Sequence, residues 1–464
     1  MTLSKRPAFF SFFPGGSLIF VGIFILGTPL RSQPYLPEKG KAPPSYTLKD
    51  CLELGLRHNV DILKAEQEIK RSQGLVITAK SVLYPRISLS GRIEERNDDV
   101  LSEGTDPKLQ RFRDYWTVSV SATQSLYSGG ANRQQIAIAK LKNTTALVQF
   151  RAVTDQVLRR IRYAVYEMVV NQAQIEAQEK TTQLLAQELI RQQQYFEAGK
   201  TTRFNVLRTQ VSLSNQKAQL FQAQSQFASS RLALARLLNI EWIPQDSQAP
   251  FSVQEELSCP PVPATLEDLT ALALTRRPEL EVLAYQIEIA ERQIKVDKAS
   301  NIPRIDAFAA YEARRDQSQS SFDSTINAGT LGLLGSWNIF DGFKGKGESL
   351  SSMAILNSTK ISLGSTRLQI QNEVRDAYGR LKTAQLSLQV QGENIKTAED
   401  SVRLAQNSAD AGFATLLDVL QATVDLTTAR LEDIRAKQRY MIALADLQYA
   451  VSLQLQDQVI PGKP

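Results

Sequence analysis

The sequence predicts a mainly α-helical chain with β-hairpins, built from one unit that is written twice. Residues 46–239 match residues 264–452, and both copies change from helical to alternating character at the same point. A repeat of this length sets the architecture before any single element is considered. The predicted unit is a short helical region, a hairpin and a long helical hairpin. The register rests on Thr47-Leu48 with Thr265-Leu266, Pro85-Arg86-Ile87 with Pro303-Arg304-Ile305, and Ala198-Gly199 with Ala411-Gly412.

The N-terminal residues 1–32 have the pattern of a secretory signal peptide. Lys5 and Arg6 precede an apolar run from Leu18 to Leu26, and helix-breaking Pro29 follows. An apolar run of about nine residues is too short to span a bilayer as a helix. Residues 33–45 are rich in Pro, so we expect a flexible segment before the first copy.

The first copy, residues 46–240, contains a predicted hairpin at about residues 86–127. Its strands are expected at residues 86–95 and 113–127, on either side of a polar loop. Along the first strand, Ile87 and Leu89 alternate with serines. This period of two predicts a sheet with one apolar and one polar face.

The second copy, residues 264–453, repeats the hairpin at about residues 304–340. Its strands are expected at residues 304–314 and 325–340. The remaining segments are a linker at residues 241–263 and a C-terminal tail at residues 454–464.

The four predicted strands have the length needed to cross a bilayer at a tilt. Four strands cannot close a barrel, and open edge amides are costly in hydrocarbon. Other copies of the chain must therefore complete the sheet. Two chains would supply eight strands and three would supply twelve, and at this point both assemblies remain open.

Long helices follow each hairpin. Residues 131–198 contain no Gly and no Pro, and as one helix they would extend roughly 100 Å. Similar runs cover residues 200–243 and 413–460. An apolar stripe at coiled-coil spacing follows the first run and is kept in the second copy at five of six positions. The stripe consists of Val153, Val157, Ile161, Ala164, Met168 and Ile175.

The composition argues against an enzyme and against a metal or cofactor site. The 464 residues include one histidine and two cysteines, so we find no convergent set of titratable groups. The net charge of +6 is spread along the chain, which argues against nucleic-acid binding. For Cys51 and Cys259, a disulfide and two unpaired thiols both remain open.

The order of these elements resembles the outer-membrane efflux protein family typified by TolC. The resemblance covers nearly the whole chain after the signal peptide and rests on several short stretches in the right order. The stretches are Tyr46-Thr-Leu-Lys-Asp, Leu126-Tyr-Ser-Gly-Gly, Arg162-Tyr-Ala-Val-Tyr, Trp337-Asn-Ile-Phe-Asp-Gly, Val374-Arg-Asp-Ala-Tyr and Ala411-Gly-Phe-Ala-Thr-Leu-Leu-Asp-Val-Leu.

The resemblance implies a homotrimer in the cell outer membrane that extends into the periplasm. A twelve-stranded β-barrel would continue into a periplasmic α-helical barrel, and the linker would lie in the equatorial region. The implied function is an exit duct for efflux or type I secretion. Its implied partners are a periplasmic adaptor (membrane fusion) protein, an inner-membrane pump or ABC exporter, and outer-membrane lipid. The competing reading is a periplasmic coiled-coil scaffold or adaptor, against which the two hairpins argue.

Gly199 and Gly412 interrupt long helical runs, as a chain does where it reverses direction tightly. The resemblance places such turns at the periplasmic tip. We therefore expect Gly199, Gly412, Phe413 and Ala414 to contact the adaptor. The alternative is a plain connection between helices.

Asp418, Gln421 and Asn205 are the expected pore constriction. Relatives often carry aspartates after the tip turn, and a threefold ring of carboxylates would attract cations. The alternative for Asp418 is a carboxylate placed at a helix N-terminus. Asn205 is the first-copy equivalent of Asp418, and Ala414 is no arginine partner, so a lock between acidic and arginine side chains at these sites is not expected.

Overall fold

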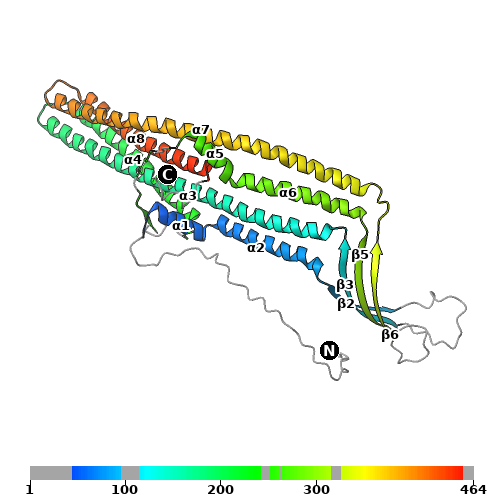
Figure 1. Cartoon of the computed structure of the whole chain (residues 1–464). Helices are drawn as coiled ribbons and strands as arrows, with labels where there is room; N and C mark the ends of the chain where they lie inside the picture. The colour runs from blue at the N-terminus through cyan, green and yellow to red at the C-terminus, as the bar shows by residue number, and fades with distance from the viewer. Residues whose placement is uncertain are drawn as a thin grey trace, which may run out of the picture. The chain divides into compact units, whose positions relative to one another are not determined.

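The computed structural model describes residues 44–95, 114–241, 251–255, 257–261, 264–314 and 326–452. The predicted signal peptide and the C-terminal tail lie outside these residues, as does most of the expected flexible segment. The described residues belong to one compact unit. Figure 1 shows their helices running side by side, with the strands at one end.

The two copies have the same elements in the same order. Each has helices of 11, 21, 67 and 35 residues, with two strands between the second and third. The duplication is therefore present in the folded chain. The first copy contains α1 (Leu48–His58), α2 (Val60–Lys80), β2 (Arg86–Glu95), β3 (Asp114–Ser128), α3 (Ala131–Glu197) and α4 (Arg203–Leu237). The second contains α5 (Leu266–Arg276), α6 (Pro278–Lys298), β5 (Arg304–Arg314), β6 (Ile326–Ser336), α7 (Lys344–Asp410) and α8 (Leu416–Ala450).

The helices pack around the predicted apolar stripe. Helix α3 contacts α2, α4, α6 and α8, and α7 contacts α5, α6 and α8. Val157, Ile161, Ala164 and Met168 are buried in the main core, as the spacing predicts. Their equivalents in α7 are also buried: Ile370, Val374, Ala377 and Leu381.

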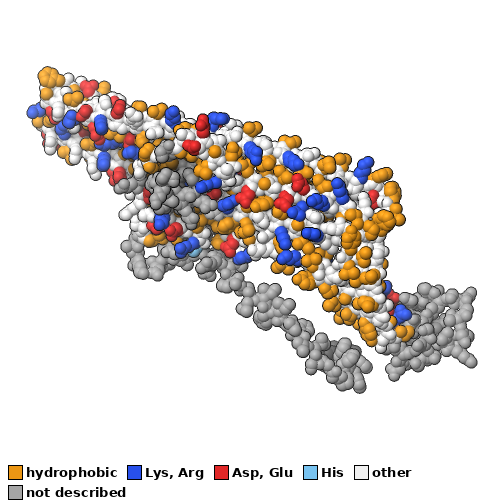
Figure 2. Space-filling model, viewed as in Figure 1, with side chains coloured by type: hydrophobic (Ala, Val, Ile, Leu, Met, Phe, Trp, Pro, Cys, Tyr) orange, Lys and Arg blue, Asp and Glu red, His pale blue; other side chains and the backbone are white. Residues whose placement is uncertain are grey.

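The strands form one antiparallel sheet in the order β2-β3-β5-β6. Its two faces differ as predicted. On one face, Ile87 lies opposite Ala122 and is 71% exposed. On the other face, Ser88 and Ser121 share a hydrogen bond between their hydroxyls at 2.8 Å. Figure 2 shows apolar side chains gathered over the sheet, while charged side chains are spread over the helices.

The expected extent of the last strand was wrong. Strand β6 ends at Ser336, which pairs with Arg304, the first residue of β5. Residues 337–340 therefore have no strand opposite them in the described part of the chain. The helical runs are also shorter than expected, because α4 ends at Leu237 and α8 begins at Leu416.

The region expected to be a linker contains a short strand. Strand β4 (Ser252–Val253) pairs in parallel with β1 (Ser45–Tyr46). Phe251 is buried, and the Tyr440 hydroxyl of α8 donates a hydrogen bond to the carbonyl of Pro260. The described part of this segment is thus held against the helices at Phe251 and at Pro260.

Both cysteines are free thiols in the structure. Cys51 lies in the core, and burial raises its pKa to about 12. Among the described residues, no helix has the length and apolar character needed to cross a membrane.

Candidate functional site

The turn between α3 and α4 and the turn between α7 and α8 lie at the same end of the helices, although they are far apart in the sequence (Figure 1). Gly199 and Gly412 both have positive φ, 71° and 80°. The Lys200 N–H donates a hydrogen bond to the backbone carbonyl of Tyr195 at 2.8 Å, and the Phe413 N–H donates one to the backbone carbonyl of Ser408 at 2.8 Å. These bonds close each helix with a left-handed residue that favours glycine. The predicted reversals are therefore present at both sites.

Phe413 projects from the second turn. It follows Gly412 and is 90% exposed, whereas Ala414 is half-buried. Other apolar side chains near the turns are exposed as well: Phe204 and Leu207 at the start of α4, and Leu417 at the start of α8. The tip thus presents apolar side chains that nothing in the described chain covers.

Asp418 has a defined role at the start of α8. Its Oδ2 accepts hydrogen bonds from the N–H and the hydroxyl of Thr415, both at 2.7 Å. The Asp418 N–H donates to the Thr415 hydroxyl at 3.3 Å, so the pair forms a capping box. These bonds favour the charged form and lower the pKa of Asp418. The helix-cap alternative is thus realised, and the carboxylate also stays exposed.

The other two expected pore residues make bonds within their own segments. The amide of Asn205 donates to the Thr201 hydroxyl at 2.9 Å. The amide of Gln421 donates to Asp425 Oδ1 at 3.0 Å. Asn205 stands where the second copy has Asp418, yet Thr202 before α4 makes no side-chain cap. The two turns therefore differ in charge and in capping.

An acid–arginine link does exist near the tip, at residues that the sequence did not single out. Arg191 of α3 donates to Asp410 of α7 at 3.2 Å and also pairs with Glu188. Glu188 is buried and accepts from the Gln192 amide at 2.8 Å. A cavity of 220 Å³ lies beside it, between α3, α7 and α8. Long-range pairing could not be read from the sequence, because Arg191 and Asp410 lie in different copies.

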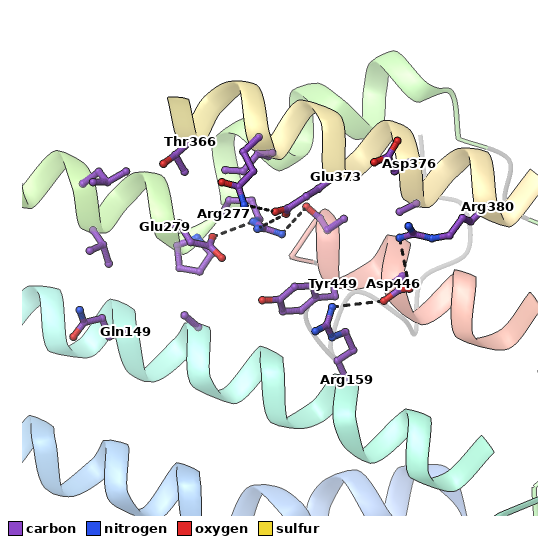
Figure 3. A pocket seen from close by; sticks show the side chains of 18 residues that line it. Gln149, Arg159, Arg277, Glu279, Thr366, Glu373, Asp376, Arg380, Asp446 and Tyr449 are labelled. Carbon is purple, nitrogen blue, oxygen red and sulfur yellow. Dashed lines mark hydrogen bonds and ion pairs between the residues drawn. The ribbon is translucent and has the colours of Figure 1, made fainter. Parts of the chain in front are cut away.

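A second charged cluster surrounds a cavity of 810 Å³ where α8 ends and α6 begins (Figure 3). Arg277 is buried and forms ion pairs with Glu279 at 3.0 Å and with Glu373 at 2.8 Å. It also donates to the carbonyl of Ala450 at 3.4 Å, so it ties the end of α8 to the start of α6.

The first copy has the same tie with a different side chain. Asn59, the equivalent of Arg277, donates to the carbonyl of Leu237 at 2.8 Å. Its Oδ1 accepts from the N–H of Asp61 at 2.9 Å and so caps α2. Each copy therefore stacks its short helix on the end of its long hairpin through one polar side chain.

Aromatic and acidic groups complete the cluster. Arg159 lies over the Tyr449 ring at 4.2 Å, and Arg277 lies near the same ring at 5.3 Å. Asp446 pairs with Arg159 at 3.6 Å and with Arg380 at 3.7 Å. The ion pairs of the cluster all join residues of this chain, which is typical of a structural network, although Arg159 Nε is buried without a hydrogen-bond partner. We find no group of residues in the described chain that could hold a metal ion.

A model of the family described as "Outer membrane efflux protein" matches residues 52–239 and 269–452, which coincide with the two copies. The alkaline protease secretion protein AprF of Pseudomonas aeruginosa is 23% identical over 408 residues, covering 87% of this chain and 83% of that protein. The outer membrane efflux protein BepC of Brucella suis is 22% identical over 443 residues, covering 95% and 91%.

Solved structures share the fold. The CmeC outer membrane channel of Campylobacter jejuni has a TM-score of 0.76 at 14% identity, covering 87% of this chain and 85% of that one. The outer membrane protein VceC of Vibrio cholerae has a TM-score of 0.72 at 20% identity, covering 87% and 95%. The predicted combination of long helices with strands is therefore a known architecture.

Proposed function

The chain belongs to the outer membrane efflux protein family and is an outer-membrane channel, and we propose that three copies of it form the exit duct of an efflux or type I secretion system. The duct would receive cargo from an inner-membrane pump through a periplasmic adaptor. Family and fold are those of channels rather than of enzymes. The scaffold alternative is set aside, because it requires a chain without paired strands.

The sheet carries this proposal. Its apolar face is exposed, and its outer strands β2 and β6 each pair on one side only within the described chain. Such a sheet is stable in hydrocarbon only if further strands cover both edges. Three chains would supply twelve strands, with the apolar face toward lipid and the serine-rich face toward the lumen.

The residues on the lumen side suit a passive duct. Ser88, Ser90, Ser119 and Ser121 form two hydroxyl pairs across β2 and β3. Small hydroxyl side chains hydrate readily and bind no particular cargo. The proposal therefore covers both kinds of relative, those named for protease secretion and those named for efflux.

The tip is the proposed site of contact with the adaptor and of the constriction. Gly199, Gly412, Phe413 and Ala414 would form the contact, supported by the exposed Phe413 side chain. Asp418 would line the pore, supported by its exposed and charged carboxylate. Gln421 and Asn205 would lie beside it, one turn further and at the equivalent position of the first copy.

Conductance of the purified protein in planar bilayers tests the proposal. We expect the total conductance to rise in discrete steps, one for each trimer inserted. A protein that binds the bilayer surface without conducting, and that stays monomeric in detergent, would overturn the duct.

A further inference from the structure

Each of the four helix ends that adjoin the sheet carries an exposed cation. Helices α2 and α6 end beside the strands, and α3 and α7 begin there (Figure 1). Lys80 is the last residue of α2, and Lys298 is the last residue of α6. Arg133 is the third residue of α3, and Lys346 is the third residue of α7. These four residues, the corner cations, are exposed, and none has an ion pair with a described residue.

The two copies place the corner cations at equivalent positions. Lys80 corresponds to Lys298 in the repeat, and Arg133 corresponds to Lys346. The copies differ in charge elsewhere, since Asn205 of the first copy stands for an aspartate of the second. Both kinds of helix end at the sheet therefore keep their positive charge in both copies.

The cations of α3 and α7 lie where a helix itself favours an acid. The first turn of a helix has a partial positive charge, which attracts anions and repels cations. The third residue of α1, α5 and α8 is an aspartate: Asp50, Asp268 and Asp418. In α3 and α7 the third residue is a cation, and the first turn contains no acid. Lys80 and Lys298 suit the C-terminal ends of their own helices, but the helix dipole does not account for Arg133 and Lys346.

The acids near these helix ends already have partners within the chain. Asp297 is buried and accepts a hydrogen bond from the Ser352 hydroxyl at 2.5 Å. Asp341 Oδ2 accepts one from an N–H of the first turn of α7 at 2.8 Å. Glu348 pairs with Lys344 at 3.8 Å. The described helix ends therefore supply the corner cations with no acidic partner.

Aromatic side chains mark the level of the membrane surface. Five of them lie at or next to the strand ends, and each is between 49% and 75% exposed: Tyr84, Tyr127, Trp337, Phe340 and Phe343. Aromatic side chains of membrane barrels gather where hydrocarbon meets water. The exposed apolar face of the sheet lies on one side of this aromatic belt, and the corner cations lie on the other. In an outer-membrane channel that extends into the periplasm, the corner cations lie beside the headgroups of the periplasm-facing leaflet.

We propose that the corner cations bind the headgroups of anionic phospholipids in the periplasm-facing leaflet of the outer membrane. A headgroup with a net negative charge, such as that of phosphatidylglycerol, supplies the anion that the first turns of α3 and α7 lack. The inference rests on the proposed function, because it takes the level of the helix ends from a sheet that spans the membrane. Apolar and aromatic contacts alone would not distinguish anionic from zwitterionic lipid.

The corner cations are close enough to the aromatic belt to act on the same lipids. Attraction to a charged lipid surface falls off within a Debye length, which is about 8 Å at physiological salt. Arg133 and Lys346 lie about 3 Å along the axis from the helix start, and Lys80 and Lys298 are terminal residues. Exposed lysines of the long helical hairpins lie more than about 50 Å farther along the helices, so they can serve as controls. These lysines are Lys180, Lys217, Lys382 and Lys396.

Quenching of tryptophan fluorescence by brominated lipids tests the proposal, because Trp337 lies in the aromatic belt. The chain has three tryptophans, so the full-length protein with W116F and W242F retains only this one. It is placed in vesicles of phosphatidylethanolamine and phosphatidylglycerol, in which one lipid or the other carries bromine on its acyl chains. We expect at least a threefold preference for phosphatidylglycerol around Trp337 at low salt, and a loss of that preference at 1 M salt.

Replacing the corner cations with Gln should remove the preference at low salt. The variant carries K80Q, R133Q, K298Q and K346Q together. The matched control carries K180Q, K217Q, K382Q and K396Q, which remove the same charge far from the sheet, and it should keep the preference. All eight side chains belong to exposed residues, so we expect both variants to assemble as the parent protein does.

Equal quenching by the two lipids in the parent protein, or a preference that survives in the corner variant, would overturn the proposal. Equal quenching together with weaker export by the corner variant would assign these cations to an acidic protein partner instead. No quenching by either lipid would place the corner outside the membrane and overturn the proposed function as well. A lipid preference in a protein that conducts no ions would support the lipid site and overturn the duct alone.

Discussion

Asp418 caps α8 in the structure and is also the residue that we propose lines the pore. Its carboxylate caps α8 and stays exposed. Because hydrogen bonds lower its pKa, it stabilises the fold above its ordinary pKa, and this contribution is lost as the pH falls through the lowered value, below about 4. At neutral pH the cap and the charge are both present.

Replacing Asp418 with Asn should reduce the cation preference of the closed pore, because the threefold ring of charge would be lost. Reversal potentials in planar bilayers with a salt gradient measure this preference. Asp50→Asn is the matched control, since Asp50 forms the same capping box with Thr47 at the start of α1. Equal selectivity in both variants and the wild type would remove Asp418 from the constriction.

Replacing Arg277 with Ala should destabilise the protein by about 2 kcal/mol, because Glu279 and Glu373 would lose their shared partner in a half-buried site. Thermal unfolding in detergent measures the loss. Arg380→Ala is the control: its side chain is largely exposed, so we expect less than about 1 kcal/mol. Equal losses would show that burial of Arg277 is unimportant.

We expect Asp155 to change stability with pH in the opposite direction to Asp418. Burial raises the pKa of Asp155 to about 6. The charge of Glu279 also raises this pKa, whereas those of Arg151, Arg162 and Arg277 lower it. The folded chain therefore holds this proton more tightly than the unfolded chain does, and stability falls as the pH rises from about 4 to about 6.

Asp155→Asn should remove that fall and raise stability at pH 7 by about 1 kcal/mol, a value reduced for the solvent that reaches the site. Unfolding temperatures at pH 5 and pH 7 compare the two proteins. An unchanged difference between the two pH values in the variant would assign the effect to another group.

At the scale of elements, substitutions at a turn glycine can distinguish an effect of backbone conformation from an effect of the surface that the turn presents. Gly412 has φ of 80°, and an added Cβ would meet no neighbour within 4 Å. A side chain there is strained by about 1 kcal/mol and projects toward solvent. Replacing Gly412 with Leu should impair export and adaptor cross-linking while leaving the assembly intact.

Gly412→Ala is the control for that variant, because it carries the same strain with only a methyl group. If Ala impairs export as strongly as Leu, the backbone conformation of the turn is responsible. Normal export with Leu would reject the turn as an adaptor contact.

The elements show where sequence reasoning succeeds. The helix from Ala131 to Glu197 was predicted within one residue, because the absence of Gly and Pro and the spacing of the apolar stripe are local signals. The first hairpin was predicted equally well. The strand expected to reach Phe340 ends at Ser336, because Ser336 pairs with Arg304, the first residue of β5.

The candidate site was harder to predict. The turns at Gly199 and Gly412 follow from local breaks in helical pattern. The link between Arg191 and Asp410, and the cluster around Arg277, join residues from both copies or from distant helices. No local pattern predicts such pairs, although each arginine lies near an acid in the sequence: Glu188 for Arg191 and Glu279 for Arg277.

At the scale of the whole molecule, the duplication explains why the same helices and strands occur twice in the same order. The helices of the two copies have equal lengths, so equivalent faces lie on either side of the chain, and in the proposed trimer each such face would meet the next chain. The sheet requires such neighbours, because its apolar face and its edges cannot be satisfied by four strands.

The mass of the complex extracted from outer membranes in detergent, taken by native mass spectrometry, decides whether the chain forms a trimeric duct. We expect three times the mass of the processed chain. A monomer, or an assembly of two chains, would contradict the twelve-stranded duct.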